Sequence, residues 1–175
     1  MPATRDAIVG TLLKSIAEGR KVQAPYPHWI LAGCISEDVL DEILALPFPA
    51  PSLGGVSGKR ELHNATRRYF DQQNMGSHGV CRAFNDAFQS RDVTSTIERT
   101  FGSRLAGTYL RVEYAQDTDG FWLEPHTDLG VKTFTMLLYA SRDPEHETLG
   151  TDIYDNDKRH IGRSPFVPGG AMVFV

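Results

Sequence analysis

Apolar positions in the first part of the chain recur at the spacing of an α-helix. The repeat begins near residue 3 and stops at Gly19, which predicts an amphipathic helix over residues 3–19. The apolar positions of this helix are Ala7, Ile8, Leu12, Leu13 and Ile16. The same spacing predicts two further helices at about residues 79–89 and 91–101, the second ended by Gly102.

Between these helices the pattern is mixed. Residues 25–31 carry two prolines followed by aromatic and branched side chains, which favours an edge strand. Ser36 is placed to cap a helix that Pro47 stops. We expect the buried stripe of that helix to comprise Val39, Leu40, Ile43 and Leu44. Residues 47–77 are rich in proline and glycine and show no apolar period, which is typical of a long functional or mobile loop.

From Leu105 onward the spacing changes to the alternation of β-strands. The expected strands are residues 108–114, 132–139, 151–154 and 171–175. Helices come first and strands follow without βαβ alternation, which favours an α+β domain with an antiparallel sandwich or barrel. We therefore expect a single domain over residues 1–175, helical up to about residue 104 and β from about residue 105.

Composition narrows the class of protein. The chain has 175 residues, of which 41% are apolar and 23% charged, with a formal charge of −4. These values are ordinary for a soluble globular domain, and the acidic balance argues against a nucleic-acid-binding surface. No apolar run is long enough to span a membrane, and no secretory signal is visible, so we expect a cytoplasmic protein. Cys34 and Cys81 are expected to pack as small apolar residues.

The sharpest chemical feature is the segment Glu124-Pro125-His126-Thr127-Asp128. If this segment is a strand, His126 and Asp128 project from the same face, because side chains two apart on a strand do so. An imidazole and a carboxylate on one face form two corners of a metal site of the two-His, one-carboxylate type that holds Fe(II). His-x-Asp alone is weakly specific, because a chain with this many aspartates often contains one by chance.

The context of His-x-Asp is more specific. Tyr114 precedes a polar turn at 116–120 and Phe121-Trp122. After the motif come Thr133 to Tyr139, the pair Gly150-Thr151, and a Pro168-Gly169-Gly170 turn into an apolar strand. This order resembles the 2-oxoglutarate- and Fe(II)-dependent oxygenases, particularly their prolyl-hydroxylase-like branch. The resemblance extends well over residues 105–175 and loosely over 24–46.

The resemblance implies a double-stranded β-helix, the jelly-roll or cupin-like core, with N-terminal supporting helices. His126 and Asp128 would be iron ligands, and no catalytic residue beyond the metal ligands is implied. Tyr139 matches the position that binds the distal carboxylate of 2-oxoglutarate, and Tyr114 one that lies beside the cosubstrate. From the residues alone, either tyrosine is equally well a core side chain whose hydroxyl meets a backbone carbonyl.

The third iron ligand, a histidine, and the basic residue for the cosubstrate normally follow the Pro-Gly turn in this family. The sequence ends at Val175, before either position, so we expect it to continue further. Only His146 and His160 follow Asp128. His146 lies in a charged segment and is expected to be solvated, and His160 precedes the turn, so neither fits the position well.

Other residues have weaker functional interpretations. The basic segment 59–70 lies in the long loop, where Arg67 or Arg68 could present a guanidinium to an anionic substrate. A solvated basic turn is the more ordinary explanation of this segment. We interpret His28, beside Trp29, as a structural residue.

The predicted function is thus an Fe(II)/2-oxoglutarate-dependent dioxygenase that hydroxylates a substrate and releases succinate and CO2. The substrate is a small molecule or a peptidyl group, and free amino acids and sugar-linked groups also stay open. Two alternatives remain: a cupin-like domain that binds a metal or ligand, and an inactive oxygenase remnant that lacks the third iron ligand.

Overall fold

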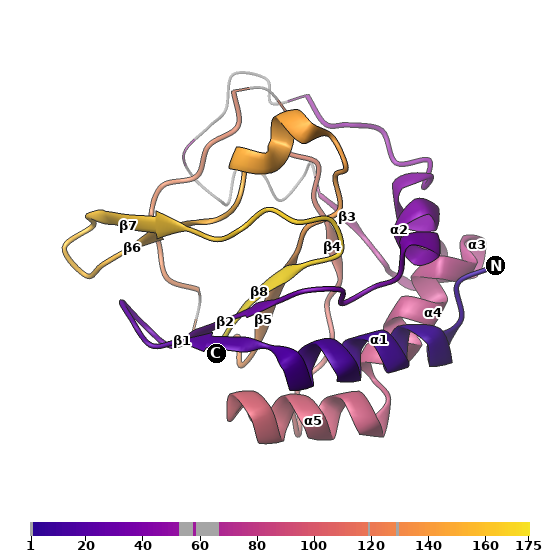
Figure 1. Ribbon diagram of the computed structural model, residues 1–175. Helices are drawn as coiled ribbons and strands as arrows, with labels where there is room; N and C mark the ends of the chain where they lie inside the picture. Colours follow the sequence, from indigo (N-terminus) through magenta and orange to yellow (C-terminus); the bar gives the residue numbers. More distant parts are fainter. Residues whose placement is uncertain (1, 53–57, 59–66, 119, 129) are drawn as a thin grey trace.

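The computed structural model describes residues 2–52, 58, 67–118, 120–128 and 130–175, and Figure 1 shows the arrangement of its elements. The helices are α1 (Arg5–Glu18), α2 (Glu37–Leu44), α3 (Gln72–Ser77), α4 (Gly79–Phe88), α5 (Arg91–Phe101) and the 3-10 helix η2 (Pro144–Thr148). The strands are β1 (Arg20–Val22), β2 (His28–Leu31), β3 (Arg68–Tyr69), β4 (Glu113–Tyr114), β5 (Thr135–Leu138), β6 (Asp152–Tyr154), β7 (His160–Arg163) and β8 (Ala171–Phe174). The fold is therefore α+β with antiparallel sheets, as the sequence predicts.

Local capping signals explain where the best-predicted helices begin and end. The hydroxyl of Thr4 accepts a hydrogen bond from the Ala7 N–H at 3.3 Å, which starts α1, and Gly19 ends it. Ser90 caps α5 in the same way, and Gly102 ends α5 in the left-handed conformation with φ 77°. The predicted helices at 3–19, 79–89 and 91–101 are confirmed.

The helix predicted between Ser36 and Pro47 is confirmed as α2, but one detail of it, the place of Leu44 in the buried stripe, is wrong. Ser36 occupies the N-cap position of α2, but its hydroxyl forms no capping hydrogen bond with a described residue. Leu44 is 40% exposed, so it does not belong to the buried stripe that Val39, Leu40 and Ile43 form. The stripe is narrower because α2 is only two turns long and ends at Leu44.

The segment predicted as a loop over 47–77 contains regular structure at its end. Helix α3 begins after Asp71, whose carboxylate accepts from the Asn74 N–H at 2.9 Å, and β3 precedes it. The capping aspartate is the local reason for the helix, which the glycine and proline content concealed. Residues 53–57 and 59–66 of the predicted loop lie outside the described part of the chain.

The main sheet has the strand order β1-β2-β8-β5, and all its pairs are antiparallel. The prediction of an edge strand at 25–31 is wrong, since β2 lies inside the sheet between β1 and β8. Both prolines, Pro25 and Pro27, precede the strand, so every residue of β2 keeps its N–H. The unpredicted β1 forms the edge instead.

The other strands are shorter than their patterns predict. Of the strand expected at 108–114, only β4 is formed, and it pairs with β3. Strand β5 begins at Thr135 rather than at 132, and β6 pairs with the unpredicted β7. The strand predicted at 171–175 corresponds to β8. No helix in the described ranges is both long enough and apolar enough to cross a membrane.

The two faces of the main sheet pack against different layers. One face, the outer face, carries Trp29 and Val173 and packs against α1 and α5, with Trp29 and Phe101 in edge contact at 5.0 Å. The inner face carries Met172, which packs with Tyr139 and with Ile153 of β6 in a second, smaller apolar cluster. Figure 1 shows this arrangement, with α1 and α5 below the sheet and β6, β7 and η2 above it.

Candidate functional site

His126 lies in a stretch without regular secondary structure rather than on a strand. Residues 124–128 form neither a helix nor a strand. The expectation that His126 and Asp128 project from the same face of a strand is therefore wrong. The ring Nδ1 of His126 hydrogen-bonds the carbonyl oxygen of Glu124 at 2.9 Å. Because a carbonyl can only accept, Nδ1 carries the proton, and Nε2 is the atom left to bind a ligand. The ring itself is exposed.

Asp128 is the more buried member of the pair, with 17% of its side chain exposed. Its Oδ1 receives the ammonium of Lys132 at 2.6 Å, and its Oδ2 receives the hydroxyl of Thr135 at 2.7 Å. Thr135 begins β5 two residues before Leu137, which pairs with Met172 of the inner face. Asp128 is therefore held against the inner face, at the start of β5.

Within the described ranges of the chain, no third side chain completes a metal site with His126 and Asp128. Among the described residues, no three His, Cys, Asp or Glu side chains are grouped so that they could hold a metal ion. His146 bonds Ser141 Oγ at 2.6 Å and is half-buried, rather than solvated as expected. The Nε2 of His160 lies 2.8 Å from the carboxylate of Asp152, on the β6–β7 hairpin.

Tyr139 is buried on the inner face, where its ring packs against Phe166 with centroids 4.9 Å apart. Its hydroxyl meets Ser164 Oγ at 2.5 Å and Thr151 Oγ1 at 2.8 Å. A phenol that contacts two hydroxyls is part of a polar network and not an isolated core side chain. In this conformation, the tyrosine hydroxyl is bonded within the protein.

The packing of Gly150 explains why a glycine precedes Thr151. A Cβ built at Gly150 would lie 1.8 Å from the backbone oxygen of Ser164. Such a distance is far inside van der Waals contact, so the two backbones approach this closely only because residue 150 has no side chain. The approach brings the hydroxyl of Ser164 within 2.8 Å of the Thr151 N–H and next to Tyr139.

Tyr114 lies on β4, in a different sheet from β5, and no hydrogen bond of the described residues links it to Tyr139. Its ring contacts Phe48 edge-on at 5.4 Å and stacks with Phe70 at 6.4 Å. Burial raises the pKa of its phenol above the usual value of 10.0. The ring of Tyr114 is thus packed between aromatic side chains, and its hydroxyl stays protonated at neutral pH.

Arg67 is not free to present its guanidinium to a ligand. It pairs with Asp117 at 2.9 Å and with Glu113 at 3.3 Å, and it lies over the ring of Phe121 at 5.5 Å. Arg68, on β3, is exposed and has no ion pair among the described residues. The rest of the predicted basic segment, residues 59–66, lies outside the described residues, as does residue 119 of the predicted polar turn.

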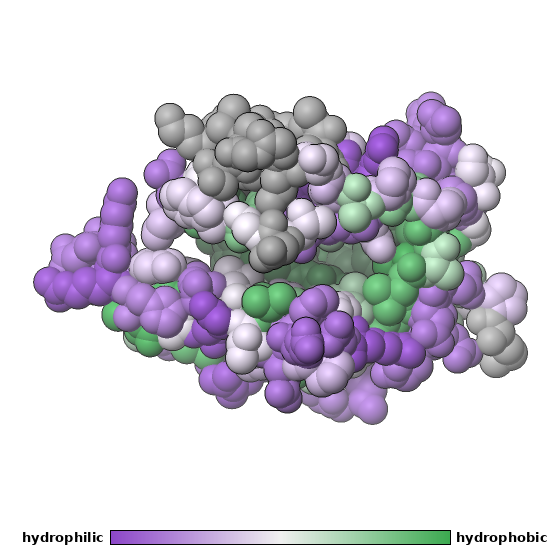
Figure 2. All heavy atoms as spheres, turned by 90° about the horizontal axis from the view of Figure 1, so that it is seen from above, coloured by the Kyte–Doolittle hydropathy of each residue, from purple (hydrophilic) through white to green (hydrophobic). Residues whose placement is uncertain are grey.

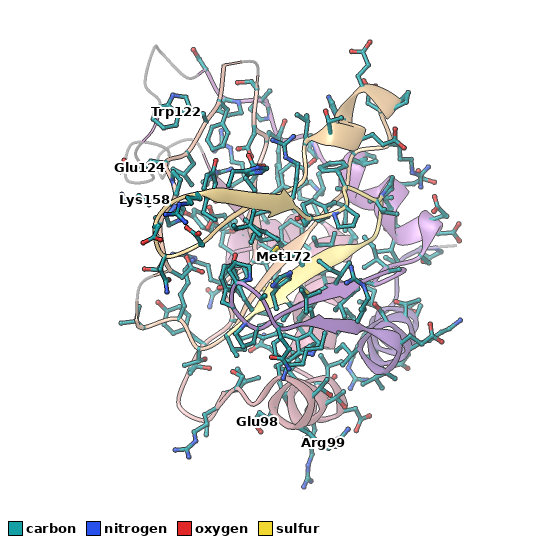
Figure 3. The ribbon with its side chains drawn as sticks, turned by 60° about the vertical axis from the view of Figure 1, so that its left-hand side comes forward. Glu98, Arg99, Trp122, Glu124, Lys158 and Met172 are labelled. Atoms are coloured by element: carbon teal, nitrogen blue, oxygen red, sulfur yellow. The ribbon has the colours of Figure 1, made fainter. Side chains whose placement is uncertain are left out.

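The stretch just before His126 is hydrogen-bonded to Gly58. The Gly58 N–H donates to the carbonyl of Trp122 at 3.1 Å, and the Glu124 N–H donates to the carbonyl of Gly58 at 3.0 Å. Figure 3 shows Trp122 and Glu124 on the opposite side of the molecule from Glu98 and Arg99 of α5. Gly58, Trp122 and Glu124 therefore lie together on the side of the molecule opposite α5.

That side is hollowed. Seen from above, the molecule has a depression with apolar residues at its bottom and hydrophilic residues around it (Figure 2). A cavity of about 270 Å³ lies between the turn at 141–147 and residues 166–168, and another of about 200 Å³ lies between the β1–β2 and β6–β7 hairpins. Neither is lined by His126 or Asp128.

Sequence reasoning missed the residues that surround the candidate ligands. Lys132 and Thr135 both bind Asp128, yet the pattern marks them only as members of a strand. The single local signal is the spacing of four residues between Asp128 and Lys132. Ser164, which binds Tyr139, has no signal in the sequence, because the contact depends on how β6 and β7 pair.

No protein-family model, no curated protein and no solved structure matches this chain. Its own residues and their geometry therefore carry the functional proposal.

Proposed function

We propose that the chain is an Fe(II)- and 2-oxoglutarate-dependent oxygenase whose sheets form part of a double-stranded β-helix. The observation that carries the proposal is the pair His126 and Asp128. The backbone holds Nδ1 of the imidazole, which leaves Nε2 for a metal, and the carboxylate lies nearby in the sequence against the inner face of the sheet. A histidine fixed through its other nitrogen is the usual arrangement of a metal ligand.

The two side chains fit an iron site as two of its three protein ligands. Nε2 of His126 and one oxygen of Asp128 are the donor types of the two-His, one-carboxylate site. Asp128 already binds a cation, because the Lys132 ammonium lies 2.6 Å from Oδ1. When bound, Fe(II) with 2-oxoglutarate would use dioxygen as the oxidant, with one oxygen atom going into succinate as CO2 is released and the other into the hydroxyl group formed on the substrate.

Tyr139 of the inner face and Tyr114 of β4 would bind and orient the cosubstrate. The Tyr139 hydroxyl suits a carboxylate, provided that it gives up its bond to Ser164 or Thr151. Tyr114 would add an apolar wall with a protonated hydroxyl. Arg67 would keep the 113–121 segment in place through Glu113 and Asp117 rather than bind substrate itself. The substrate class proposed is a small molecule or a peptidyl group.

A second function is favoured by the Lys132–Asp128 ion pair. If this pair is permanent, Asp128 is a structural anchor of β5, and the domain is a cupin-like ligand-binding module or an inactive oxygenase remnant. The two functions make different predictions about metal binding. The oxygenase binds Fe(II) and 2-oxoglutarate together, whereas the module shows no response to 2-oxoglutarate.

The deciding experiment is an anaerobic Fe(II) titration with and without 2-oxoglutarate. A saturable visible metal-to-ligand charge-transfer band that needs both components supports the oxygenase. The variant Asp128→Asn should lose the band, while Asp86→Asn, at an exposed position of α4, should keep it. Absence of the band, together with an unchanged melting temperature in 2-oxoglutarate and Fe(II), would rule out an active oxygenase site within these 175 residues and leave the binding module or the inactive remnant.

A further inference from the structure

The cavity of about 200 Å³ between the β1–β2 and β6–β7 hairpins is built from one face of the main sheet. Its lining includes Arg20, Val22, His28 and Ile30 from the sheet, and Ile161 and Ser164 from the β6–β7 side. Arg20 pairs with Ile30 and Val22 pairs with His28, so these four side chains share the inner face. Lys21 and Trp29 alternate with them and lie on the outer face, where the ammonium of Lys21 is 5.0 Å from the Trp29 ring.

His28 brings a buried polar atom to this cavity. The residue is only 3% exposed, and its Nδ1 donates to the carbonyl oxygen of Tyr26 at 2.9 Å. Its Nε2 has no hydrogen-bond partner in the part of the chain that the structure describes. Buried polar atoms are nearly always paired, so Nε2 of His28 is available to bond a polar group that enters the cavity.

The guanidinium of Arg20 places a positive charge in the lining of the cavity. It forms no ion pair with any described residue, although it lies diagonally across the β1–β2 pair from His28. The second arginine of the lining, Arg163, is fully used, since its guanidinium binds both oxygens of Asp152 and the carbonyl of Thr148. The only arginine of the lining that remains available in the described structure is therefore Arg20.

The remaining lining is mostly hydrocarbon, and the size of the cavity limits its occupant. Branched and ring side chains, among them Val22, Ile30 and Ile161, surround the space between Arg20 and His28. A cavity of about 150 Å³ in another protein holds benzene, so about 200 Å³ holds a molecule slightly larger than a single ring.

We propose that this cavity is a binding site for a small organic acid with a compact apolar body. The carboxylate would accept hydrogen bonds from the guanidinium of Arg20, and a water molecule would bridge the carboxylate to Nε2 of His28 by donating one hydrogen to each. The site does not include Asp128, although its Ser164 also bonds the hydroxyl of Tyr139. Thr135, which binds Asp128, is on β5, and His28 is on β2, two strands away with β8 between them. The cavity extends from β2 to β1, and β1 lies three strand spacings, or about 14 Å, from β5. The inference does not depend on the proposed oxygenase function.

The test is a titration of the ¹⁵N-labelled protein with benzoate, with benzamide as the neutral molecule of the same shape. Benzoate is expected to shift the amides of residues 20–30 and 161–164 in a saturable way at millimolar concentrations or below. Benzamide should bind about tenfold more weakly or worse, because it lacks the charge that Arg20 recognises.

Three variants make the site assignment falsifiable. Arg20→Gln should weaken benzoate binding about tenfold, while Lys21→Gln, which removes the same charge from the other face of β1, should leave it within about twofold. His28→Asn keeps a donor for the Tyr26 carbonyl, removes Nε2, and should also weaken binding. If benzoate does not bind, if benzamide binds equally well, or if Arg20→Gln binds like Lys21→Gln, the proposal is wrong.

Discussion

Replacing Lys132 by methionine tests whether Asp128 is available to a metal ion. Methionine preserves the length of the side chain and removes the ammonium that lies 2.6 Å from Asp128 Oδ1. In the protein without metal, this ion pair competes with any divalent cation for the same carboxylate. Removing the competitor should therefore tighten metal binding and, at the same time, destabilise the protein without metal.

The contacts of Lys132 and Asp128 determine the size of both effects, the gain in metal affinity and the loss of stability without metal. A hydrogen bond between charged groups is worth a net of about 1.5–3 kcal/mol. Both side chains keep partial contact with solvent, with 23% of Lys132 and 17% of Asp128 exposed, and Thr135 continues to bind Asp128 after the substitution. We therefore expect the lower end of the range, about 1.5 kcal/mol, which corresponds to about tenfold tighter metal binding.

Manganese provides a direct assay, because Mn²⁺ accepts the same oxygen and nitrogen donors and its free ion is counted by electron paramagnetic resonance. Wild type, Lys132→Met and the control Lys14→Met, which removes an exposed charge of α1, would be titrated side by side. The double variant Asp128→Asn/Lys132→Met should lose the gain. If Lys132→Met binds manganese no more tightly than Lys14→Met, the ammonium does not occupy a metal position, and Asp128 is an anchor of β5.

Three further predictions concern stability and reactivity. Gly150→Ala should lower the free energy of unfolding by about 2–3 kcal/mol in urea denaturation, since its methyl group would collide with the backbone of Ser164; an unchanged midpoint would contradict this. The hydrogen bonds and charge of Arg163 hold the pKa of Asp152 below its usual value, so this pair stabilises the fold above about pH 3.9 and the stabilisation is lost as the pH falls through the depressed value. Asp152→Asn should accordingly flatten the acid side of the stability profile, and an equally steep profile would refute the assignment. Burial raises the pKa of the Cys81 thiol to about 11, so this thiol should react with a disulfide reagent at pH 8 only after denaturation, and fast labelling of the native protein would show that Cys81 is accessible.

The helices were predictable because their signals are local. Thr4, Ser90 and Gly102 each act within one turn of the helix that they limit, so their effect is visible in a short stretch of sequence. The expectation that both cysteines are buried is also confirmed, with Cys34 and Cys81 each fully inaccessible to solvent.

The sheet was less predictable because its partners are distant in the sequence. Nothing near residues 28–31 indicates that β2 pairs with β8, and this pairing decides that β2 is not at an edge. The candidate site was also only partly predictable, because several of its contacts join residues that are distant in the sequence. His126 and Asp128 are recognisable as a motif, but the cation that accompanies Asp128 and the hydroxyls that bind Tyr139 come from side chains whose roles only the fold reveals.

The pairing of β2 with β8 also has a consequence for how the chain folds. Trp29 lies opposite Val173, so the sheet is completed only when nearly the whole polypeptide has closed into a single loop. Contacts of such high sequence separation slow folding, because the entropy of loop closure is lost before the contact forms. Until then the backbone N–H and C=O groups of β8 that face β2 are unpaired. An apolar strand with such an unpaired edge can pair with a strand of another chain. We therefore expect the β half produced alone, residues 105–175, to aggregate, and the N-terminal hairpin to act as its built-in protection.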